Sequence, residues 1–370
     1  MLGLIPEPPY ASRSWSGSSA HFFRALRRQQ LLATAERVQF SRALESWHKA
    51  RAFTLPMDRW KAAYHASVPR FEALSEAARY VVTRHPDVNS IIQVGCWFSA
   101  AVSNGPPCYS YHDGNAAMWY RHYGRGLLSE RQVQRHLHWE RRTYAQMAGI
   151  FVMSSWLGES FIADFGVPRD KVHVVGAGVN LEALPTVPDR DFSVPRFLIV
   201  GRDFERKGGR YLLDAFELVR RQVPNAELIV VGPDPQPAVP GVTFAGFLDK
   251  SDPAHRARLD DIFRSATAFV LPSIYEPFGV ALAEAMAYGL PCVAVDRCAM
   301  PEIVLDGVTG WIAQPEDAAS LAQAMLDVAH SPSAASSMGM KGRAHVEERF
   351  TWDRVAERIA DVVRSHASGT

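Results

Sequence analysis

Short apolar runs alternate with helix-like segments through the second half of the chain, and this alternation constrains the fold most. The runs lie at 196–201, 226–232, 242–248, 266–272, 291–296 and 310–315. Segments with helical periodicity, such as 208–222 and 317–330, separate several of them. Short apolar runs are typical of buried parallel strands. Strand and helix in alternation therefore predict βαβ units, in which helices cover both faces of a parallel sheet.

The first half shows the same alternation less regularly. Expected strands lie at 90–97, 149–155 and 172–178, and expected helices at 18–34, 58–84 and 129–147. Residues 180–195 are rich in Pro and Asp and lack periodicity, which is typical of a linker. The prediction is an α/β protein with two doubly wound, Rossmann-like domains that face each other across a cleft. We place the first domain at 1–180, the linker at 181–195 and the second domain at 196–350.

Composition narrows the class of protein. A chain of 370 residues suits two domains, and 47% hydrophobic with 21% charged residues indicates a folded, soluble protein. No N-terminal signal pattern and no apolar run near the ~20 residues of a membrane span is present. The four cysteines lack CxxC spacing, so we expect reduced thiols in a cytoplasmic protein and no zinc site.

The charge is unevenly distributed. Residues 1–185 hold 21 Lys and Arg against 14 Asp and Glu, a net of +7, and residues 186–370 hold 19 against 25, a net of −6. A basic first half favours an anionic partner, such as a membrane surface or a phosphorylated acceptor. The alternative is a chance difference between solvated faces. We find no zinc-finger spacing or aromatic–basic RNA signature, so no nucleic-acid partner is expected.

A carboxylate lies inside an apolar helical segment at 278–290. Glu284 is in its middle and Glu276 stands just before it. Pro277 suits the first helical position, which would leave the amides of Phe278, Gly279 and Val280 free to bind phosphate. The two carboxylates could then accept hydrogen bonds from the hydroxyls of a sugar and a ribose. The alternative, ordinary salt bridges for both acids, is the less favoured one for Glu284.

A second loop carries two cations. Arg202 follows a strand-ending Gly, and Lys207 precedes the pair Gly208–Gly209. A planar guanidinium and a point charge on one loop suit a diphosphate, although charged loops of this kind are common.

Together these motifs resemble the retaining glycosyltransferases of the GT-B fold, family 4. The resemblance rests on "VGRDFERKGG", "VTFAGFL", "VLPSIYEPFGVALAEAMAYGLPCVAVD", "PEIVLDGVTGWIAQPED" and "RFTWDRVAERI" in the second half. In the first half "SWSGSSAHFFRAL", "YSYHDG" and "SSWLGESFIADFGVPRDKVHVVGAGVN" are similar to the family's loops and strands. Met300 stands where the family often has glycine, and residues 35–75 match no family pattern.

The resemblance implies roles for individual residues. Arg202 and Lys207 would bind the diphosphate of a nucleotide-sugar donor, Glu276 the hydroxyls of the sugar, and Glu284 the ribose. Further donor-binding positions would be Gly17, Phe247, Leu248, Phe278, Gly279 and Val280. His112 would lie near the anomeric carbon, with His122 as its competitor for that role. The C-terminal helix, 351–370, would pack back on the first domain.

We therefore expect a metal-independent enzyme without cofactor that transfers a hexose from a nucleotide-diphosphate sugar to a saccharide or lipid-linked acceptor. Cell-surface polysaccharide, lipopolysaccharide or glycolipid synthesis would be its setting. An epimerase or phosphorylase on the same fold is the alternative. A NAD-dependent dehydrogenase is disfavoured because no GxGxxG follows a strand, and a non-catalytic binding module because every donor-site position is filled.

The acceptor side of the prediction rests on two features of the first half. Segment 18–33 is basic and amphipathic, which favours peripheral binding to the inner face of the cell membrane; the alternative is a core helix that exposes arginines. The second feature is a set of aromatic residues near the expected cleft: Trp97, Tyr109, Tyr111, Trp119 and Tyr120.

Overall fold

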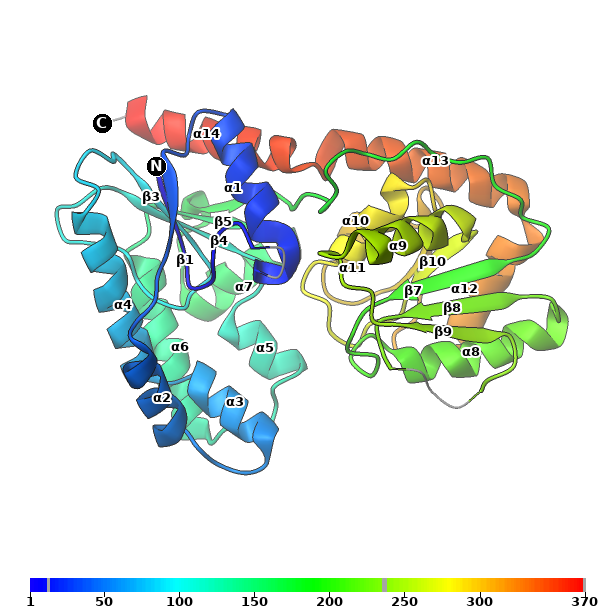
Figure 1. The fold of residues 1–370 in the computed structure, drawn as a ribbon, viewed down its shortest axis with the longest axis horizontal. Helices are drawn as coiled ribbons and strands as arrows, with labels where there is room; N and C mark the ends of the chain where they lie inside the picture. Colours follow the sequence, from blue (N-terminus) through cyan, green and yellow to red (C-terminus); the bar gives the residue numbers. More distant parts are fainter. Residues whose placement is uncertain (12–13, 235–237, 369–370) are drawn as a thin grey trace. The chain divides into compact units, whose positions relative to one another are not determined.

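The computed structural model describes residues 1–11, 14–234 and 238–368. Two compact units divide the chain (Figure 1). The first comprises Met1–Gly176 and Val355–Thr370, and the second comprises Ala177–Arg354. Each unit is built on one six-stranded parallel sheet with helices on both faces, so the predicted α/β fold class is confirmed.

The first unit contains the smaller and less regular elements. Its strands are β1 (Leu2–Ile5), β2 (Thr34–Arg37), β3 (Ile91–Val94), β4 (Cys108–His112), β5 (Gly149–Val152) and β6 (Val172–Val174). Its helices are α1 (Ser18–Arg28), α2 (Arg42–Arg51), α3 (Met57–His65), α4 (Val68–Thr83), α5 (Ala116–His122), α6 (Glu130–Ala145), α7 (Ser155–Phe165) and most of α14 (Trp352–Ser368), with short 3-10 turns at Ser14–Gly17 and Arg169–Lys171.

The strand order in this sheet is β2-β1-β3-β4-β5-β6. The chain moves from β1 outward to β2 and then returns to β3 on the other side of β1, with Leu2 opposite both Thr34 and Ile91. The topological switch point therefore lies between β1 and β3. Ligands of open α/β sheets bind outside the carboxyl ends of the strands at such a point.

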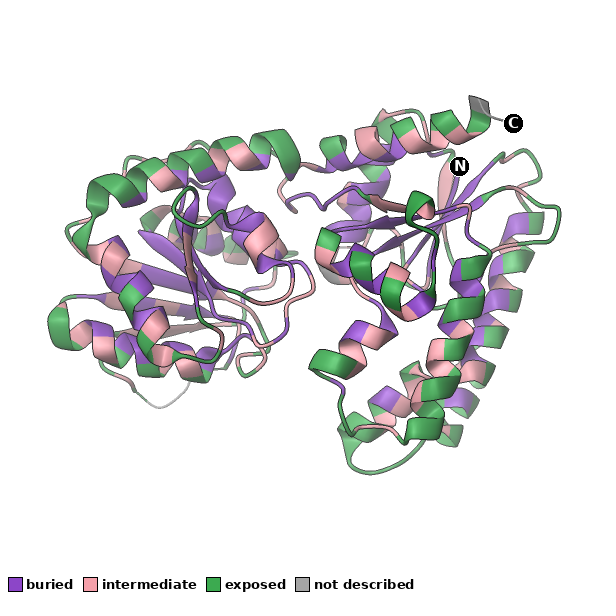
Figure 2. Cartoon of the chain, turned by 180° about the vertical axis from the view of Figure 1, so that it is seen from behind, coloured by how far each residue is buried: buried purple, intermediate pink, exposed green. Residues whose placement is uncertain are grey.

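Tyr109 and Tyr111 of β4 are two positions apart and so point to the same face of the sheet, which α1 and α14 cover. Tyr111 stacks on Phe22 of α1 with ring centroids 4.7 Å apart, and the Tyr109 hydroxyl lies 3.1 Å from the His366 ring of α14. Tyr109 and Tyr111 are fully buried, so the expectation that they gather near an acceptor is wrong. Figure 2 shows the same pattern throughout: burial is concentrated on the strands and on the helix sides that face them.

The apolar side of α1 is part of this core. Phe22 and Phe23 are fully buried, and Arg24, Arg27 and Arg28 are exposed. The helix is thus the core helix with exposed arginines that formed the alternative prediction. Its apolar face is not available to a membrane. Within the described residues, no helix is long and apolar enough to cross one.

The region that matched no family pattern forms regular structure. It contains β2, α2 and α3, and the expected single helix at 58–84 is two helices, α3 and α4. Ser67 precedes α4 in an extended conformation, and Pro69 occupies its first turn. A proline favours the first turn of a helix, where its missing N–H has no intrahelical acceptor to lose, and it disfavours a helix interior, so Pro69 ends α3 and begins a new helix.

The second unit follows the predicted alternation closely. Its strands are β7 (Arg196–Val200), β8 (Glu227–Val231), β9 (Val242–Gly246), β10 (Ala268–Leu271), β11 (Cys292–Val295) and β12 (Gly310–Ala313). Its helices are α8 (Gly209–Gln222), α9 (Pro253–Ser265), α10 (Val280–Ala287), α11 (Met300–Ile303), α12 (Ala318–His330) and α13 (Pro332–Arg349). All six strands expected in the second half are present.

Strand order here is β12-β11-β10-β7-β8-β9, which puts the switch point between β7 and β10. Right-handed crossovers place α8 on one face, where α12 packs beside it, and α9 and α10 on the other (Figure 1). The helix α13, which periodicity did not predict, packs against α10. Gly339 permits this contact, since a Cβ there would lie 2.0 Å from the carbonyl oxygen of Gly289.

The segment predicted as a linker is anchored to the second unit. The Arg190 guanidinium donates hydrogen bonds to the carbonyl oxygens of Ala266, Arg264 (3.0 Å) and Tyr288 (2.5 Å). Arg343 of α13 donates to the carbonyl oxygen of Pro185 at 2.5 Å. These contacts explain why the boundary between the two units falls at Gly176, ahead of the Pro-rich stretch.

Candidate functional site

Two loops meet at the switch point of the second sheet. One follows β7 and leads to α8, and the other follows β10 and leads to α10. They approach so closely that a Cβ on Gly208, whose φ is +76°, would lie 1.9 Å from the carbonyl oxygen of Pro272. Only glycine fits there. The predicted cations of the first loop are thereby brought to the predicted carboxylate of the second.

Lys207 and Glu276 form an ion pair at this junction. The Lys207 ammonium contacts Glu276 Oε2, and Arg206 Nη1 lies 3.5 Å from the same oxygen. Arg206 also donates to the carbonyl oxygen of Tyr275 at 2.6 Å. Burial alone would raise the pKa of Glu276, but Lys207 and Arg206 outweigh it and hold the pKa below its ordinary value. Glu276 is therefore an anion held by two cations.

Arg206 was absent from the predicted site. The sequence offered a signal for it, since it precedes Lys207 directly in the same loop. Its backbone also ties the loops together, because its carbonyl oxygen accepts a hydrogen bond from the Ile274 amide at 2.9 Å.

Arg202 lies at the entrance to the same loop and is exposed. Its guanidinium lies 4.6 Å from the ring centroid of Phe247, which is 43% exposed. This cation–π contact holds the charge in place without an acidic partner. Leu248, the next residue, is buried. The structure thus brings together Arg202 and Phe247, which were predicted to contact different parts of one donor.

Glu284 is buried, at 5% exposure, and is not alone. Lys250 Nζ lies 3.0 Å from both of its carboxylate oxygens. The salt bridge that was the less favoured alternative for Glu284 is therefore present in this structure. Lys250 was missed, although it stands two positions after Leu248 in the predicted base-binding segment. Because the Lys250 side chain is 44% exposed, it can exchange this partner for another.

The predicted start of the helix after Glu276 is wrong. Pro277 is not helical: α10 begins at Val280, and Gly279 is its N-cap with a φ of +97°. The free amides of the first turn are therefore those from Val280 onward. The Phe278 side chain is buried and contacts the Phe350 ring at 5.9 Å. Since Glu276 precedes the helix, its position relative to Glu284 follows from the loop and not from helical periodicity.

His112 is the last residue of β4 in the first unit, and it is 1% exposed. Its ring packs against Tyr144 and Phe161, with centroids 5.4 and 5.0 Å away. Neither ring nitrogen has a hydrogen-bond partner in the described part of the chain. Burial lowers the pKa of His112 to about 3, so the ring is neutral. Its catalytic role stays a prediction, and so does that of its competitor His122, whose ring lies 5.6 Å from that of Trp156.

The residues around His112 at this edge are better placed to meet a ligand. Asp113 Oδ2 accepts a hydrogen bond from the Trp15 indole at 3.2 Å. Gly17 caps α1 with a φ of +91°, a conformation that favours glycine. Trp15 and Gly17 belong to the same turn, so the hydrogen bond from Trp15 links the predicted Gly17 loop to Asp113.

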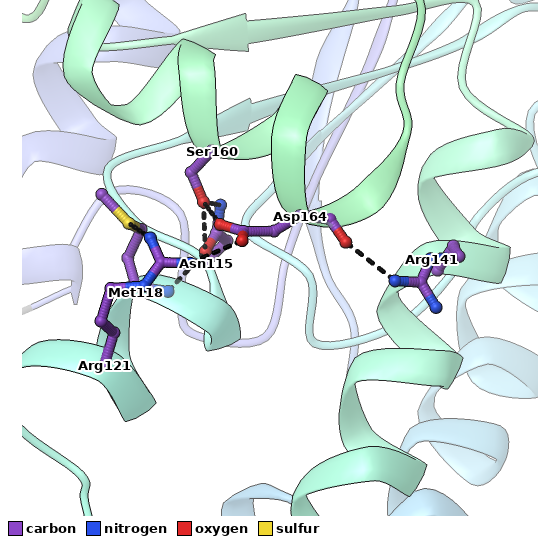
Figure 3. A network of polar contacts seen from close by, with 6 residues as sticks. All are labelled: Asn115, Met118, Arg121, Arg141, Ser160 and Asp164. Carbon is purple, nitrogen blue, oxygen red and sulfur yellow. Dashed lines mark hydrogen bonds and ion pairs between the residues drawn. The ribbon is translucent and has the colours of Figure 1, made fainter.

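A polar network holds the turn that follows β4 (Figure 3). The Asn115 side chain caps α5 and donates to Ser160 of α7 at 3.0 Å. Ser160 donates to Asp164 at 2.6 Å, and Asp164 pairs with Arg121 at 2.5 Å. Arg141 of α6 donates to the Asp164 carbonyl oxygen at 2.8 Å. The network fixes α5 against α6 and α7, which positions the turn.

The charged side chains of the second unit that were predicted to bind the nucleotide-sugar donor are cations and carboxylates, and several of them form ion pairs. Among residues 1–11, 14–234 and 238–368, no group of three His, Cys, Asp or Glu side chains is placed to hold a metal ion. What the arrangement offers is fixed positive charge beside carboxylates at a strand edge, which suits a phosphate-bearing ligand with hydroxyl groups.

Solved structures of GT-B glycosyltransferases share this architecture of two doubly wound parallel sheets. Comparison with known proteins identifies the chain more closely. Residues 24–183 match the model "Glycosyltransferase Family 4", and residues 194–331 match "Glycosyl transferases group 1". The chain belongs to the glycosyltransferases that these two models describe.

Curated relatives and solved structures agree with this family. Alpha-maltose-1-phosphate synthase of Mycolicibacterium smegmatis is 30% identical over 258 residues, 61% of this chain and 65% of the relative. The chain spans less than two thirds of the length of the curated relatives it matches first. Sucrose-phosphate synthase from Thermosynechococcus elongatus has a TM-score of 0.74 at 18% identity, covering 100% of this chain and 99% of that one. Anabaena HepE in complex with UDP and glucose has a TM-score of 0.65 at 16% identity, covering 98% and 99%.

Proposed function

We propose that the chain transfers a hexose from a nucleotide-diphosphate sugar to an acceptor hydroxyl with retention at the anomeric carbon. The observation that carries this proposal is the convergence of Lys207 and Arg206 on Glu276 at the switch point of the second sheet. Arg206 also pairs with Asp203 at 3.4 Å, so the net positive charge for a diphosphate comes from Arg202 on the same loop, with three cations against two carboxylates in these contacts. The carboxylate can meet the hydroxyls of the sugar.

The reaction breaks the bond between the anomeric carbon and the diphosphate oxygen and forms one to the acceptor oxygen. The nucleotide diphosphate leaves with the bonding electrons, and the acceptor hydroxyl loses its proton. Negative charge grows on the leaving group, so Lys207 and Arg202 stabilise the transition state more than the ground state. The cations do the work that a divalent metal does in other transferases, so we propose a metal-independent reaction.

The two buried acids have separate roles in this proposal. Glu276 binds the sugar hydroxyls while Lys207 turns partly toward the phosphate. Glu284 binds the ribose once Lys250 leaves it, and Phe247 and Leu248 lie beside the base. Val280 contributes the first free amide of α10, and Gly279, which has no side chain, lets the ligand approach it. Roles for Gly17 and His112 of the first unit rest on the resemblance to the family.

The names of the relatives guide the choice of substrates. One structure holds UDP and glucose, so UDP-sugars are the first donors to test. Two relatives are named for phosphorylated disaccharides, maltose 1-phosphate and sucrose phosphate. We place the reaction in the cytoplasm, in the synthesis of a cell-surface polysaccharide, lipopolysaccharide or glycolipid. The basic first unit would bring the enzyme to an anionic membrane surface.

The test is a panel of UDP-, GDP-, ADP- and dTDP-sugars with purified protein, with and without EDTA. Slow release of nucleotide diphosphate from one donor, unchanged by EDTA, is the expected result. Proton NMR of the transfer product then reports whether the anomeric configuration of the donor is kept. Conversion of the donor sugar to its epimer without release of nucleotide would favour the epimerase alternative. A protein that neither hydrolyses nor binds any donor is not a transferase.

A further inference from the structure

A pocket of about 460 Å³ lies at the switch point of the first sheet. Ile5 and Val94, the last residues of β1 and β3, both line it. Trp15, which is hydrogen-bonded to Asp113, and Trp97, in the loop after β3, also line it. The volume falls in the range of small-molecule sites, and the position is the one at which open α/β sheets bind ligands.

Arg70 of α4 gives this pocket an unusual property. The residue is 7% exposed, and its Nε and Nη1 atoms are buried without a hydrogen-bond partner. No carboxylate of the described residues pairs with it. Its guanidinium lies 4.7 Å from the ring centroid of Tyr64 and 5.8 Å from that of Trp97. A guanidinium stays charged in a protein, and cation–π contacts offset only part of the free-energy cost of burying that charge without a paired anion.

The acids of the pocket do not compensate Arg70. Glu45 pairs with Lys49 at 2.6 Å, and Glu7 accepts the backbone N–H of Trp15 at 2.6 Å. Lys61, which also lines the pocket, has no ion pair among the described residues. Lys49, Lys61 and Arg70 stand against Glu7 and Glu45, so the pocket carries a net charge of +1 among the aromatic rings of Trp15, Trp60, Tyr64 and Trp97.

We propose that this pocket binds the acceptor and that the acceptor is a sugar with a phosphate or carboxylate group. The oxyanion lies on the free edge of the Arg70 guanidinium, whose planar fork fits two oxygens of such a group. Tyr64 and Trp97 hold the fork in plane and offer apolar surface to the sugar ring. The claim that the pocket binds the acceptor rests on the proposed function. The claim that it binds an anion rests on Arg70 alone.

Calorimetry without any donor tests the pocket by itself. Glucose 1-phosphate, glucose 6-phosphate, inositol 3-phosphate and glucuronate are titrated beside their neutral counterparts, glucose and inositol. We expect at least one anionic sugar to bind about tenfold or more tightly than its counterpart, and the phosphate and glucuronate arms show which group is preferred. R70Q should weaken that binding by about 10- to 100-fold and R70K by less. R79Q, an exposed position on the same helix, is the matched control.

The same variants separate this inference from the proposed function. K207A, in the second unit, should keep anionic-sugar binding while losing hydrolysis of the donor, whereas R70Q should lose anionic-sugar binding and, with it, transfer to that acceptor. If an anionic sugar binds but no donor is turned over, the anion-binding pocket is supported and the transferase proposal is contradicted. If no anionic sugar binds more tightly than its neutral counterpart, or if R70Q and R79Q bind alike, the inference is overturned. Should R70Q fail to fold, K61Q and W97L replace it, with the same loss expected.

Discussion

At the scale of single residues, the ion pair of Lys207 and Glu276 links stability to activity. Both side chains are nearly buried, so removing one leaves the other charge poorly compensated. We expect K207A and E276Q each to lower transfer by roughly 100-fold or more and the free energy of unfolding by roughly 2–4 kcal/mol. Urea unfolding of both variants and of the double variant measures the coupling. Additive losses of stability would show that the pair is not formed in solution.

Glu140 of α6 makes stability depend on pH. Burial raises the pKa of Glu140 to about 8, against the opposing hydrogen bond from the Ala116 amide at 3.0 Å. The folded protein therefore keeps this proton up to about pH 8, whereas the unfolded chain loses it near pH 4.5. Between these values the folded state binds more protons, so the free energy of unfolding falls as pH rises.

E140Q keeps an oxygen for the Ala116 amide but cannot titrate. From pH 5 to pH 8 we expect wild type to lose stability relative to E140Q by a few kcal/mol, on the order of one per pH unit. Urea unfolding at three pH values, with E72Q on an exposed part of α4 as control, measures the difference. Parallel pH profiles for wild type and E140Q would mean that Glu140 titrates normally.

A site residue could be predicted when it belongs to a short sequence motif, and it could not when its role depends on contacts with distant segments. Lys207 and Glu276 were found because each stands in a short loop motif next to a strand end. Lys250 was not, because its partner Glu284 lies on a different element, and a contact between distant segments leaves no spacing to detect. Arg70 was not found either, since its isolation depends on Tyr64 and Trp97 and on the absence of a nearby free carboxylate among the residues that the structure describes.

At the scale of elements, Gly279 decides where α10 starts. Its φ of +97° is costly for any other residue, and a Cβ added there would lie 3.2 Å from Leu282 Cδ1, its closest neighbour. We expect G279A to lose roughly 1–2 kcal/mol and to bind the nucleotide sugar less tightly, because the first amides of α10 shift. Calorimetric titration with the donor measures the second effect.

Gly166, the C-cap of α7, provides the control for that variant. Its φ is +70° with no atom within 4 Å of a Cβ, so G166A carries the same kind of strain in the first unit. It should lose similar stability and keep the affinity for the donor. Equal affinity in G279A and G166A would remove the α10 amides from the donor site.

Helices and strands were predictable where the hydrophobic periodicity was strong and turn residues marked both ends. The six strands of the second sheet are short apolar runs between turn residues, and all six are present. The start of α10 could not be inferred from Pro277, because the loop from β10 must first bring Glu276 to Lys207. The break between α3 and α4 was marked by Pro69, but helical periodicity on both sides concealed it.

At the scale of the whole molecule, the two units differ in charge more sharply than the two halves of the sequence. The first unit holds 23 Lys and Arg against 15 Asp and Glu, a net of +8. The second holds 17 against 24, a net of −7. The change of one charge comes from moving the boundary to Gly176, which puts Glu182 in the second unit, while residues 355–370 add two Arg and two acidic residues and so no net charge. Opposite signs suit a unit that receives an anionic acceptor or meets an anionic surface.

This charge makes a specific prediction about membranes. Since the apolar face of α1 is buried, attraction to a bilayer has to be electrostatic and hence screened by salt. We expect the protein to sediment with vesicles that contain phosphatidylglycerol in low salt and to stay in the supernatant at about 0.5 M salt, where the Debye length is only a few Å. Phosphatidylcholine vesicles are the control. Failure to sediment in low salt would contradict the membrane prediction. Sedimentation that survives high salt would point instead to apolar side chains that the first unit exposes, such as Trp47, Phe53 and Leu55.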